Sequence, residues 1–226
     1  SDTVLGAIMI RVENLRFGYP RGGFQLSVDS LAVASGERVA VVGPSGCGKT
    51  TLLHLLAGIL TPGSGSVRVD EVEISGLGRE DRQDFRALAV GLIFQEFELL
   101  EYLDVLDNVL VPYRVSPALA LDGAARDRAL ALIEEVGLAD KKSSYPGELS
   151  QGERQRVAVC RSLVTGPKVL FGDEPTANLD TDNRDLVMDT LFRYTQEQQA
   201  PLVVVTHDFE LRGRFETVLD VREMGP

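Results

Sequence analysis

Residues 43–50 form a glycine-rich segment that constrains the fold of this chain more than any other part of it. The segment reads Gly-Pro-Ser-Gly-Cys-Gly-Lys-Thr and fits the pattern G-x-x-x-x-G-K-[ST], which is typical of a phosphate-binding loop. The β-branched residues 39–42 precede it and predict a buried strand, and the apolar residues 52–60 follow and predict a helix. This strand–loop–helix order is the context in which the pattern binds nucleotide phosphates.

The residue types in this loop suit a polyphosphate. Gly43, Gly46 and Gly48 permit backbone angles that turn successive N–H groups toward one anion, and the helix start adds partial positive charge. Lys49 supplies a mobile positive charge for the β- and γ-phosphates, and the Thr50 hydroxyl is placed to bind Mg²⁺. We therefore predict that ATP and Mg²⁺ bind through this segment. Its expected contacts are Gly43, Pro44, Ser45, Gly46, Cys47, Gly48, Lys49, Thr50 and Thr51.

Two acidic residues follow a predicted strand far downstream. The apolar residues 169–172 lead directly into Asp173 and Glu174. Downstream of a phosphate loop, this arrangement is typical of an aspartate that holds Mg²⁺, directly or through water, followed by a base. We expect Glu174 to polarise the attacking water, an effect worth about 10²–10⁴ in rate. His207 follows the buried run 202–205, so we expect it on the ligand side of an open α/β sheet, in contact with the γ-phosphate.

Two other features each permit two interpretations. Ser150 and Glu153 fit the S-x-x-E capping box, which would simply start a helix. The same helix start would also present Ser150 and the N–H of Gly152 as an anion site. Tyr19 could stack on an adenine face or could be a surface residue in a Gly-Tyr-Pro turn. The residues alone leave both choices open.

The order of predicted elements indicates an α/β protein built on a mostly parallel sheet with flanking helices. Alternating segments near the N-terminus predict an antiparallel β-subdomain, and a helical stretch between the β-rich flanks predicts an inserted α-helical subdomain. The expected strands are 10–16, 24–31, 38–42, 90–94, 169–173 and 202–205, with a hairpin at 62–76 and helices at 122–137, 157–164 and 182–196. We expect residues 1–226 to form a single unit, with a core of about 8–95 and 165–226 and a helical subdomain of about 96–164.

The charge and the cysteines limit the partners and the compartment. The net charge is 23 − 34 = −11, which repels phosphate backbones and argues against a nucleic-acid ligand. Cys47 and Cys160 provide no disulfide framework and indicate a reducing compartment, with Cys160 expected in the core. No apolar run approaches the roughly 18 residues that a membrane span needs, so we expect a soluble, cytoplasmic chain.

The order of these motifs resembles that of the nucleotide-binding subunit of ABC transporters, and the resemblance covers nearly the whole chain. Tyr19 matches the family's adenine-stacking aromatic residue. Residues 52–56 and 175–180, Leu-Leu-His-Leu-Leu and Pro-Thr-Ala-Asn-Leu-Asp, are similar to the lipoprotein-releasing and macrolide-export subgroup and its cell-division relative. The matching motifs, in order, are the phosphate loop, the glutamine-loop residue Gln95, the signature at 149–153, Asp173 with Glu174, Asp180, and His207.

The resemblance implies a head-to-tail homodimer, or a pair of ATPase subunits, with two ATP molecules buried between the protomers. Each ATP would meet the phosphate loop of one chain and Ser150 and Gly152 of the other, with Asp180 nearby, and Gln95 would bind Mg²⁺ and sense the attacking water. The helical subdomain, especially residues 97–102, would dock an integral membrane permease at the inner face of the membrane. Two other functions remain: a regulatory ATPase that moves no cargo, and a soluble ABC ATPase acting on ribosomes or DNA, which the single cassette and the acidic charge disfavour.

The signature departs from the common family form at two positions. Gln151 stands where the family usually has glycine, and Glu153 stands where it usually has glutamine. Because Ser150 and Gly152 are retained, we expect the chain to be active. Glu153 places a negative charge near the expected phosphates, so we also expect it to weaken ATP-driven closure.

Overall fold

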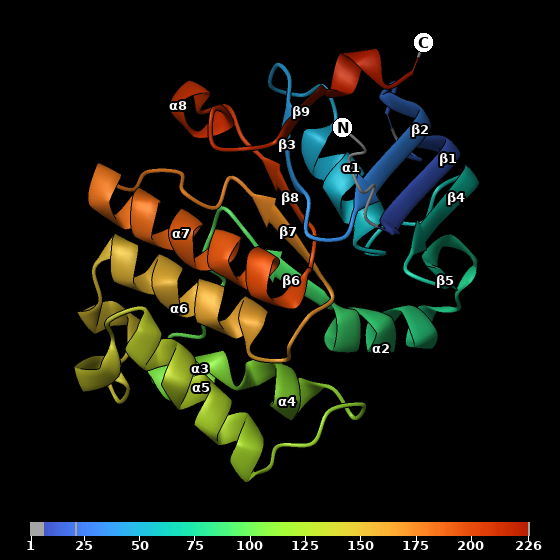
Figure 1. Cartoon of the computed structure of the whole chain (residues 1–226). Helices are drawn as coiled ribbons and strands as arrows, with labels where there is room; N and C mark the ends of the chain where they lie inside the picture. Colours follow the sequence, from blue (N-terminus) through green and yellow to red (C-terminus); the bar gives the residue numbers. More distant parts are fainter. Residues whose placement is uncertain (1–6, 21, 226) are drawn as a thin grey trace.

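The computed structural model describes residues 7–20 and 22–225 and contains two β-sheets that share one core (Figure 1). The first sheet has the strand order β2-β1-β4-β5, and every pair in it is antiparallel. Its strands are β1 (Ile8–Gly18), β2 (Gln25–Ala34), β4 (Ser64–Val69) and β5 (Val72–Glu73). The expected antiparallel β-subdomain and the hairpin within 62–76 are therefore confirmed.

The second sheet has five strands in the order β6-β7-β8-β3-β9, and all its pairs are parallel. Its strands are β3 (Arg38–Val42), β6 (Val90–Ile93), β7 (Val169–Asp173), β8 (Leu202–Val205) and β9 (Thr217–Asp220). Val203 and Val205 pack into the core shared with the antiparallel sheet, whereas Leu202 and Val204 pack on the opposite side. Because both faces of the inner strands β7, β8 and β3 are covered, their sequences are mostly apolar rather than alternating, whereas the edge strand β9 is partly exposed.

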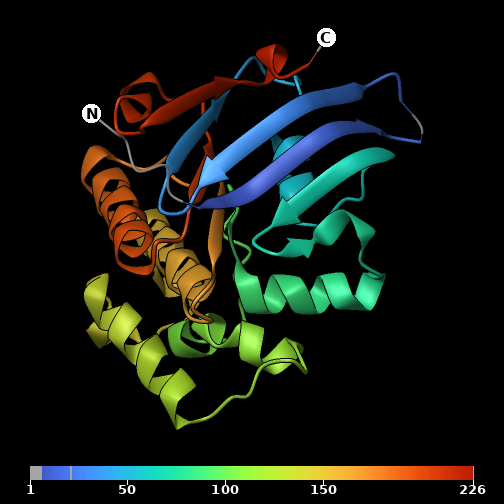
Figure 2. The ribbon, with the colours of Figure 1, turned by 45° about the vertical axis from the view of Figure 1, so that its right-hand side comes forward.

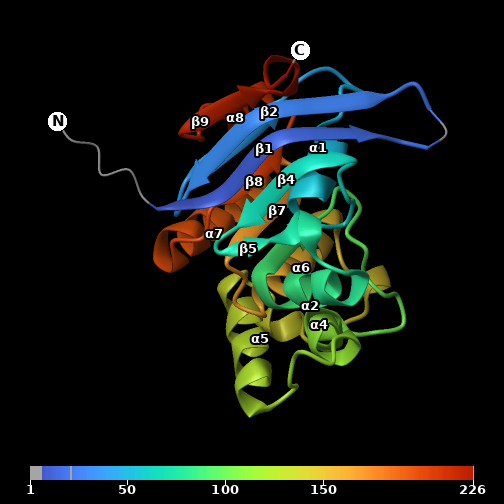
Figure 3. The ribbon, with the colours of Figure 1, turned by 90° about the vertical axis from the view of Figure 1, so that its right-hand side faces the viewer.

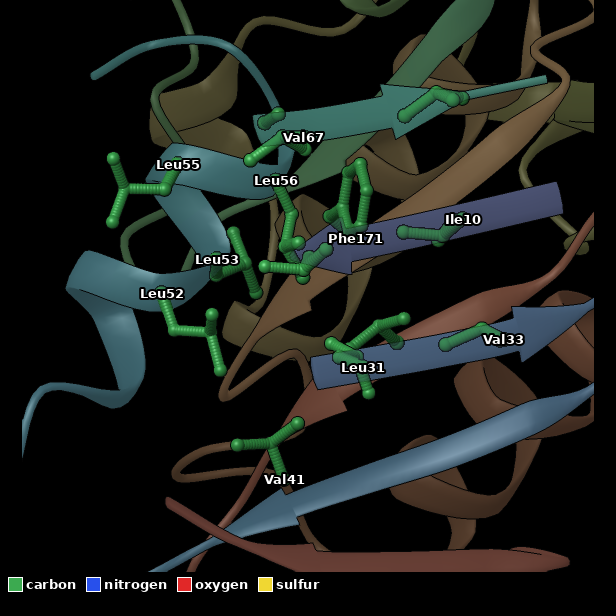
Figure 4. Close-up of a cluster of buried hydrophobic side chains, with 14 of the residues drawn as sticks. Ile10, Leu31, Val33, Val41, Leu52, Leu53, Leu55, Leu56, Val67 and Phe171 are labelled. Carbon is green, nitrogen blue, oxygen red and sulfur yellow. The ribbon is translucent and has the colours of Figure 1, made fainter. Parts of the chain in front are cut away.

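Helix α1 (Lys49–Leu56) packs against both sheets and fills the shared core (Figure 4). The prediction that the helix continues to residue 60 is wrong. Gly58 adopts a left-handed φ of 67°, the Gly58 N–H donates to the Leu55 carbonyl at 3.1 Å, and the Ile59 N–H donates to the His54 carbonyl at 2.8 Å. These two bonds form a Schellman motif that satisfies the last carbonyls and turns the chain away.

The parallel sheet carries α6 (Gln151–Leu163) and α7 (Thr181–Gln198) on the face opposite α1. Figure 1 shows the antiparallel sheet on one side of the parallel strands and these two helices on the other, and in Figure 3 the antiparallel sheet faces the viewer. The predicted helices 157–164 and 182–196 are thus present, although α6 begins six residues earlier, at the capped start that the sequence offered.

The segment between β6 and α6 forms a helical layer with a hydrophobic core of its own (Figure 2). Its helices are α3 (Val105–Val109), α4 (Val111–Val115) and α5 (Gly123–Glu135), and α5 accounts for the helix expected at 122–137. Helix α6 contributes Val157 and Cys160 to this core and Val159 and Leu163 to the core of the parallel sheet, so it joins the two layers. The remaining elements are α2 (Arg79–Ala89), α8 (Phe209–Arg212), η1 (Ile74–Gly76), η2 (Ala139–Lys141), η3 (Pro146–Glu148) and η4 (Val221–Glu223).

Cys160 is fully buried, as expected, and burial raises the pKa of its thiol. Within the residues that the structure describes, no helix is both long enough and apolar enough to span a bilayer.

Candidate functional site

The glycine-rich loop connects the carboxyl end of β3 to α1, as the sequence predicts. Gly48 is the N-cap of α1 and has a φ of 104°, a conformation that residues with a side chain rarely adopt. A Cβ atom at this position would also lie 2.6 Å from Cζ of Phe24. Glycine is therefore required at residue 48 both by the backbone angle and by the close approach of the aromatic ring that directly precedes β2.

Lys49 is held by the loop that precedes it. Its ammonium group donates to the carbonyls of Gly43 and Pro44, each at 2.9 Å. The first N–H groups of α1 have no acceptor within the helix, so the loop and the helix start together present donors and positive charge. This end of α1 is chemically suited to an anion.

The acidic pair lies at the carboxyl end of β7. Asp173 is the last residue of the strand, and the Glu174 N–H donates to the Val205 carbonyl at 3.0 Å, which ties the turn to β8. Glu174 has a φ of 49°, a left-handed conformation that costs a non-glycine residue about 1–2 kcal/mol. Backbone strain of this kind persists where the surrounding structure holds the residue, and it is often found at functional sites.

His207 contacts the carboxylate of Glu174. Its Nδ1 atom lies 2.7 Å from Oε1 of Glu174, and its backbone N–H donates to Oε2 at 3.5 Å. The side chain of Glu174 is only 14% exposed, whereas that of His207 is 74% exposed. His207 therefore reaches from the surface and fixes the orientation of a largely buried carboxylate.

A pocket of about 410 Å³ brings most of the predicted residues together at the carboxyl ends of the parallel strands. This position follows the general rule for ligand sites in open α/β sheets. The predicted residues in its lining are Tyr19, Ser45, Gly46, Gly48, Lys49, Thr50, Thr51, Gln95, Asp173 and Glu174. The predicted loop residues Gly43, Pro44 and Cys47 contribute to the loop but do not line the pocket, and Cys47 is half-buried against the core.

Tyr19 lies at one wall of this pocket. Its hydroxyl is 3.1 Å from the Thr51 hydroxyl, and its ring meets Phe17 edge-on with centroids 4.9 Å apart. The residue as a whole remains 43% exposed. A fixed and partly exposed aromatic face beside a polar pocket is suited to stacking, so the structure favours a ligand-facing position over an unattached surface position.

The fit of a divalent cation follows from the donor types. Thr50, Gln95 and Asp173 line the same pocket and offer a hydroxyl, an amide and a carboxylate oxygen, which are ligands that Mg²⁺ accepts. Across residues 7–20 and 22–225, no cluster of three or more His, Cys, Asp and Glu side chains is arranged to hold a metal ion. A cation here would therefore share its coordination with oxygens of the bound ligand, as Mg²⁺ commonly does at phosphate sites.

Ser150 and Gly152 lie at the start of α6 and are not part of the pocket lining described above. The capping box is present: the Glu153 N–H donates to Oγ of Ser150 at 3.3 Å, and the Ser150 N–H donates to Oε2 of Glu153 at 2.7 Å. The capping interpretation is thus correct for the isolated chain. The anion-site interpretation is compatible with it, because the first N–H groups of α6 still lack intrahelical acceptors.

Asp180 is also outside the pocket and caps α7. Its carboxylate accepts hydrogen bonds from the backbone and side-chain nitrogens of Asn183, at 2.9 and 2.7 Å. These bonds lower the pKa of Asp180. The side chain of Asn183 lies directly against Gly152 and also accepts a hydrogen bond from Arg156, so the starts of α6 and α7 are linked.

Sequence reasoning missed several residues of this site. Phe24 and Val205 line the pocket, and Asn183 supports Gly152. Val205 could have been predicted, because it ends the expected strand 202–205 and His207 was already expected on the ligand side of the sheet. Phe24 directly precedes β2 of the other sheet, and nothing in that stretch indicates which loop its ring will meet. Buried Gln155, which donates to the Pro175 carbonyl, was equally unmarked.

The chain is similar to known proteins both in sequence and in fold. The model of the family described as ABC transporter matches residues 26–177. The lipoprotein-releasing system ATP-binding protein LolD of Xanthomonas campestris pv. campestris (strain 8004) is 41% identical over 229 residues, covering 98% of this chain and 95% of the relative. The protein of the same name from Syntrophotalea carbinolica is 40% identical, with 96% of each chain covered.

Two solved structures share the fold of this chain. The dimeric structure of MJ0796, a bacterial ABC transporter cassette, aligns with a TM-score of 0.83 and 30% identity, covering 96% of this chain and 97% of that one. A dimeric post-hydrolysis state of the same cassette, bound to ADP and Pi, aligns with a TM-score of 0.83 and 29% identity, covering 94% of each chain.

Proposed function

The chain belongs to the ABC transporter family and is an ATPase of that type, and we propose that two copies close head to tail around two Mg-ATP molecules to drive a membrane partner. The observation that supports this proposal most strongly is that two expected parts of the ATP site, the phosphate-loop pocket and the start of α6, are separate within one chain. The pocket at the carboxyl ends of the strands holds the phosphate loop, whereas Ser150 and the free N–H groups of α6 lie outside it. A second copy of the chain, turned end for end, would complete each pocket with the start of its own α6.

Within one pocket, the proposed roles follow from charge and position. Lys49 and the loop N–H groups bind the phosphates, and the ring of Tyr19 stacks on the adenine. Bound Mg²⁺, held by Thr50, Gln95 and Asp173, would neutralise charge that develops on the phosphates. These residues account for the binding of ATP and Mg²⁺. A different group must activate the attacking water.

Glu174 is the proposed general base. It is an acceptor for a proton of the attacking water, and its carboxylate is held by His207 at 2.7 Å. We propose that His207 orients Glu174 before ATP binds and contacts the γ-phosphate when the dimer closes. The strained backbone at residue 174 supports this assignment, because it fixes the carboxylate at the mouth of β7.

The membrane partner is proposed to dock on the helical layer. A groove of about 470 Å³ lies between α4 and the sheet edge, with Leu92, Phe94, Val111, Pro112 and Val115 in its lining, and Val115 is 72% exposed. An apolar groove of this kind suits an amphipathic helix of an integral membrane permease. Since the relatives at 40–41% identity are named for lipoprotein release, we propose a complex of that type, with this chain peripheral on the inner face of the membrane.

The experiment that tests the proposal uses Glu174→Gln with Mg-ATP. We expect this variant to bind ATP with normal affinity, to hydrolyse it at least about 100-fold more slowly, and to accumulate as a dimer. Tagged Glu174→Gln should then co-isolate a polytopic membrane protein from detergent-solubilised native membranes. Lys49→Ala is the matched control, since it should neither bind ATP nor form the dimer.

Two results would contradict the proposal. Normal turnover by Glu174→Gln would remove Glu174 as the base. Co-isolation of only ribosomal or DNA-repair proteins would retain the ATPase and remove the membrane partner.

A further inference from the structure

Glu153 and Lys141 form an ion pair next to Ser150. None of the roles proposed above involves this pair. Nζ of Lys141 lies 2.7 Å from Oε1 of Glu153, and the Glu153 side chain is only 16% exposed. Lys141 is the last residue of η2, a different element from α6, so the pair joins two segments of the helical layer. The Lys141 side chain is 36% exposed, so the pair is partly shielded and less screened by salt than a pair between two fully exposed side chains.

The two carboxylate oxygens of Glu153 have different partners. Oε2 accepts the Ser150 N–H, which closes the capping box, while Oε1 faces the Lys141 ammonium. Lys141 and the Ser150 bonds together lower the pKa of Glu153, so the carboxylate is ionised at neutral pH. Oγ of Ser150 accepts the Glu153 N–H, and a hydroxyl that accepts one bond still has its own hydrogen to donate. The arrangement therefore leaves the Ser150 hydroxyl as a donor for an anion.

The backbone at Lys141 is anchored to the helical layer. Its N–H donates to the carbonyl of the buried Leu138 at 3.0 Å, and the next residue, Lys142, accepts the Leu106 N–H of α3 at 3.0 Å. The backbone that carries the ammonium is thus tied to the core of the helical layer. The Lys141 ammonium, 2.7 Å from Oε1 of Glu153, therefore offsets the negative charge of that carboxylate at the start of α6.

We propose that Lys141 is a positioning residue for ATP-driven closure: it neutralises Glu153 and holds the capping box so that Ser150 can receive the partner's γ-phosphate. This inference rests on the proposed head-to-tail dimer. It replaces the sequence-based expectation that Glu153 alone weakens closure, because the charge that an approaching phosphate meets is that of the pair. Without Lys141, an unbalanced carboxylate would face the polyphosphate and repel it.

The test measures dimerisation and ATP binding separately. In the Glu174→Gln background with Mg-ATP, sedimentation velocity across protein concentrations gives the dimer dissociation constant. Titration with a fluorescent ATP analogue at low protein concentration gives the affinity of the monomer. We expect Lys141→Met to raise the dimer dissociation constant about tenfold while monomer affinity stays within about twofold. Lys141→Arg should behave as the parent, and Lys142→Met, which removes an exposed charge one residue away, is the matched control.

A second variant separates charge from a merely structural role. Adding Glu153→Gln to Lys141→Met should restore most of the lost dimerisation, because glutamine retains the cap and removes the charge. The effect of Lys141→Met should also shrink at 1 M salt, where the Debye length falls to about 3 Å.

Three results would overturn the inference. Lys141→Met could dimerise like the parent, the double variant could remain as weak as Lys141→Met, or monomer affinity could fall as much as dimerisation. If the Glu174→Gln parent itself forms no dimer with Mg-ATP, the head-to-tail proposal fails first, before any change at Lys141 is made.

Discussion

Replacement of Gly152 by alanine should destabilise the chain through a contact within the protomer, before any ligand is considered. A Cβ at residue 152 would lie 2.4, 2.5 and 2.8 Å from Cγ, Oδ1 and Nδ2 of Asn183. The Asn183 amide has little freedom to retreat. Its Nδ2 donates to Oδ2 of Asp180 at 2.7 Å, its Oδ1 accepts from Arg156, and the backbone N–H of Asn183 donates to Oδ1 of Asp180 at 2.9 Å.

The size of the effect follows from that tethering. Atoms added to a packed region typically lower the free energy of unfolding by about 1–3 kcal/mol. Because Asn183 is hydrogen-bonded to both Asp180 and Arg156, we expect a loss of about 2–3 kcal/mol here. For a chain of this length, each kcal/mol lowers the melting temperature by about 2–4 °C, which gives a decrease of roughly 4–12 °C. Such a shift is easily resolved.

The assay is thermal and urea unfolding of Gly152→Ala, Asn183→Ala and the double variant. Asn183→Ala alone should also destabilise, because Asp180 and Arg156 lose a partner. In the double variant the clash is gone, so its loss should be smaller than the sum of the single losses by at least about 1 kcal/mol. Gly147→Ala is the control, since a Cβ there meets nothing within 4 Å.

The reasoning is refuted if Gly152→Ala is as stable as Gly147→Ala, or if the two single effects simply add. Either result would mean that the Asn183 side chain does not exclude a side chain at residue 152.

Three further predictions concern stability, acid sensitivity and binding. Tyr113→Phe should cost about 1 kcal/mol in urea unfolding, because the buried hydroxyl donates to the Val164 carbonyl at 2.8 Å; an unchanged midpoint would contradict this. Arg222 lowers the pKa of Asp220 from 3.8 to about 2, so this pair stabilises the fold above pH 4 and its contribution is lost as the pH falls toward 2. In Asp220→Asn, the melting temperature should therefore fall less between pH 4 and pH 2 than it does in the parent. A decline as steep as that of the parent would refute the assignment. Lys49→Ala should lose nucleotide affinity in a fluorescence titration without a change in melting temperature, and retained binding would remove the lysine from the phosphate site.

Much of the site could be predicted because its chemistry is local in sequence. A phosphate loop depends on backbone angles and donors within residues 43–50, and its pattern states them directly. The ends of buried strands at Asp173 and before His207 are equally visible, and parallel strands bring their carboxyl ends to one edge. The capping box at Ser150 and Glu153 is a contact across three positions of one helix start, so the sequence predicts it as well.

The sequence by itself therefore determined the class of fold, the phosphate loop, the acidic pair and the start of α6. Only the tertiary structure decided that Phe24 covers Gly48, that His207 holds Glu174, that Asn183 lies against Gly152, and that Lys141 neutralises Glu153. The physical reason is distance along the chain. Local motifs follow from backbone conformation and short-range periodicity, whereas these side chains meet because separate elements pack in a particular register, and no short stretch of sequence encodes that register.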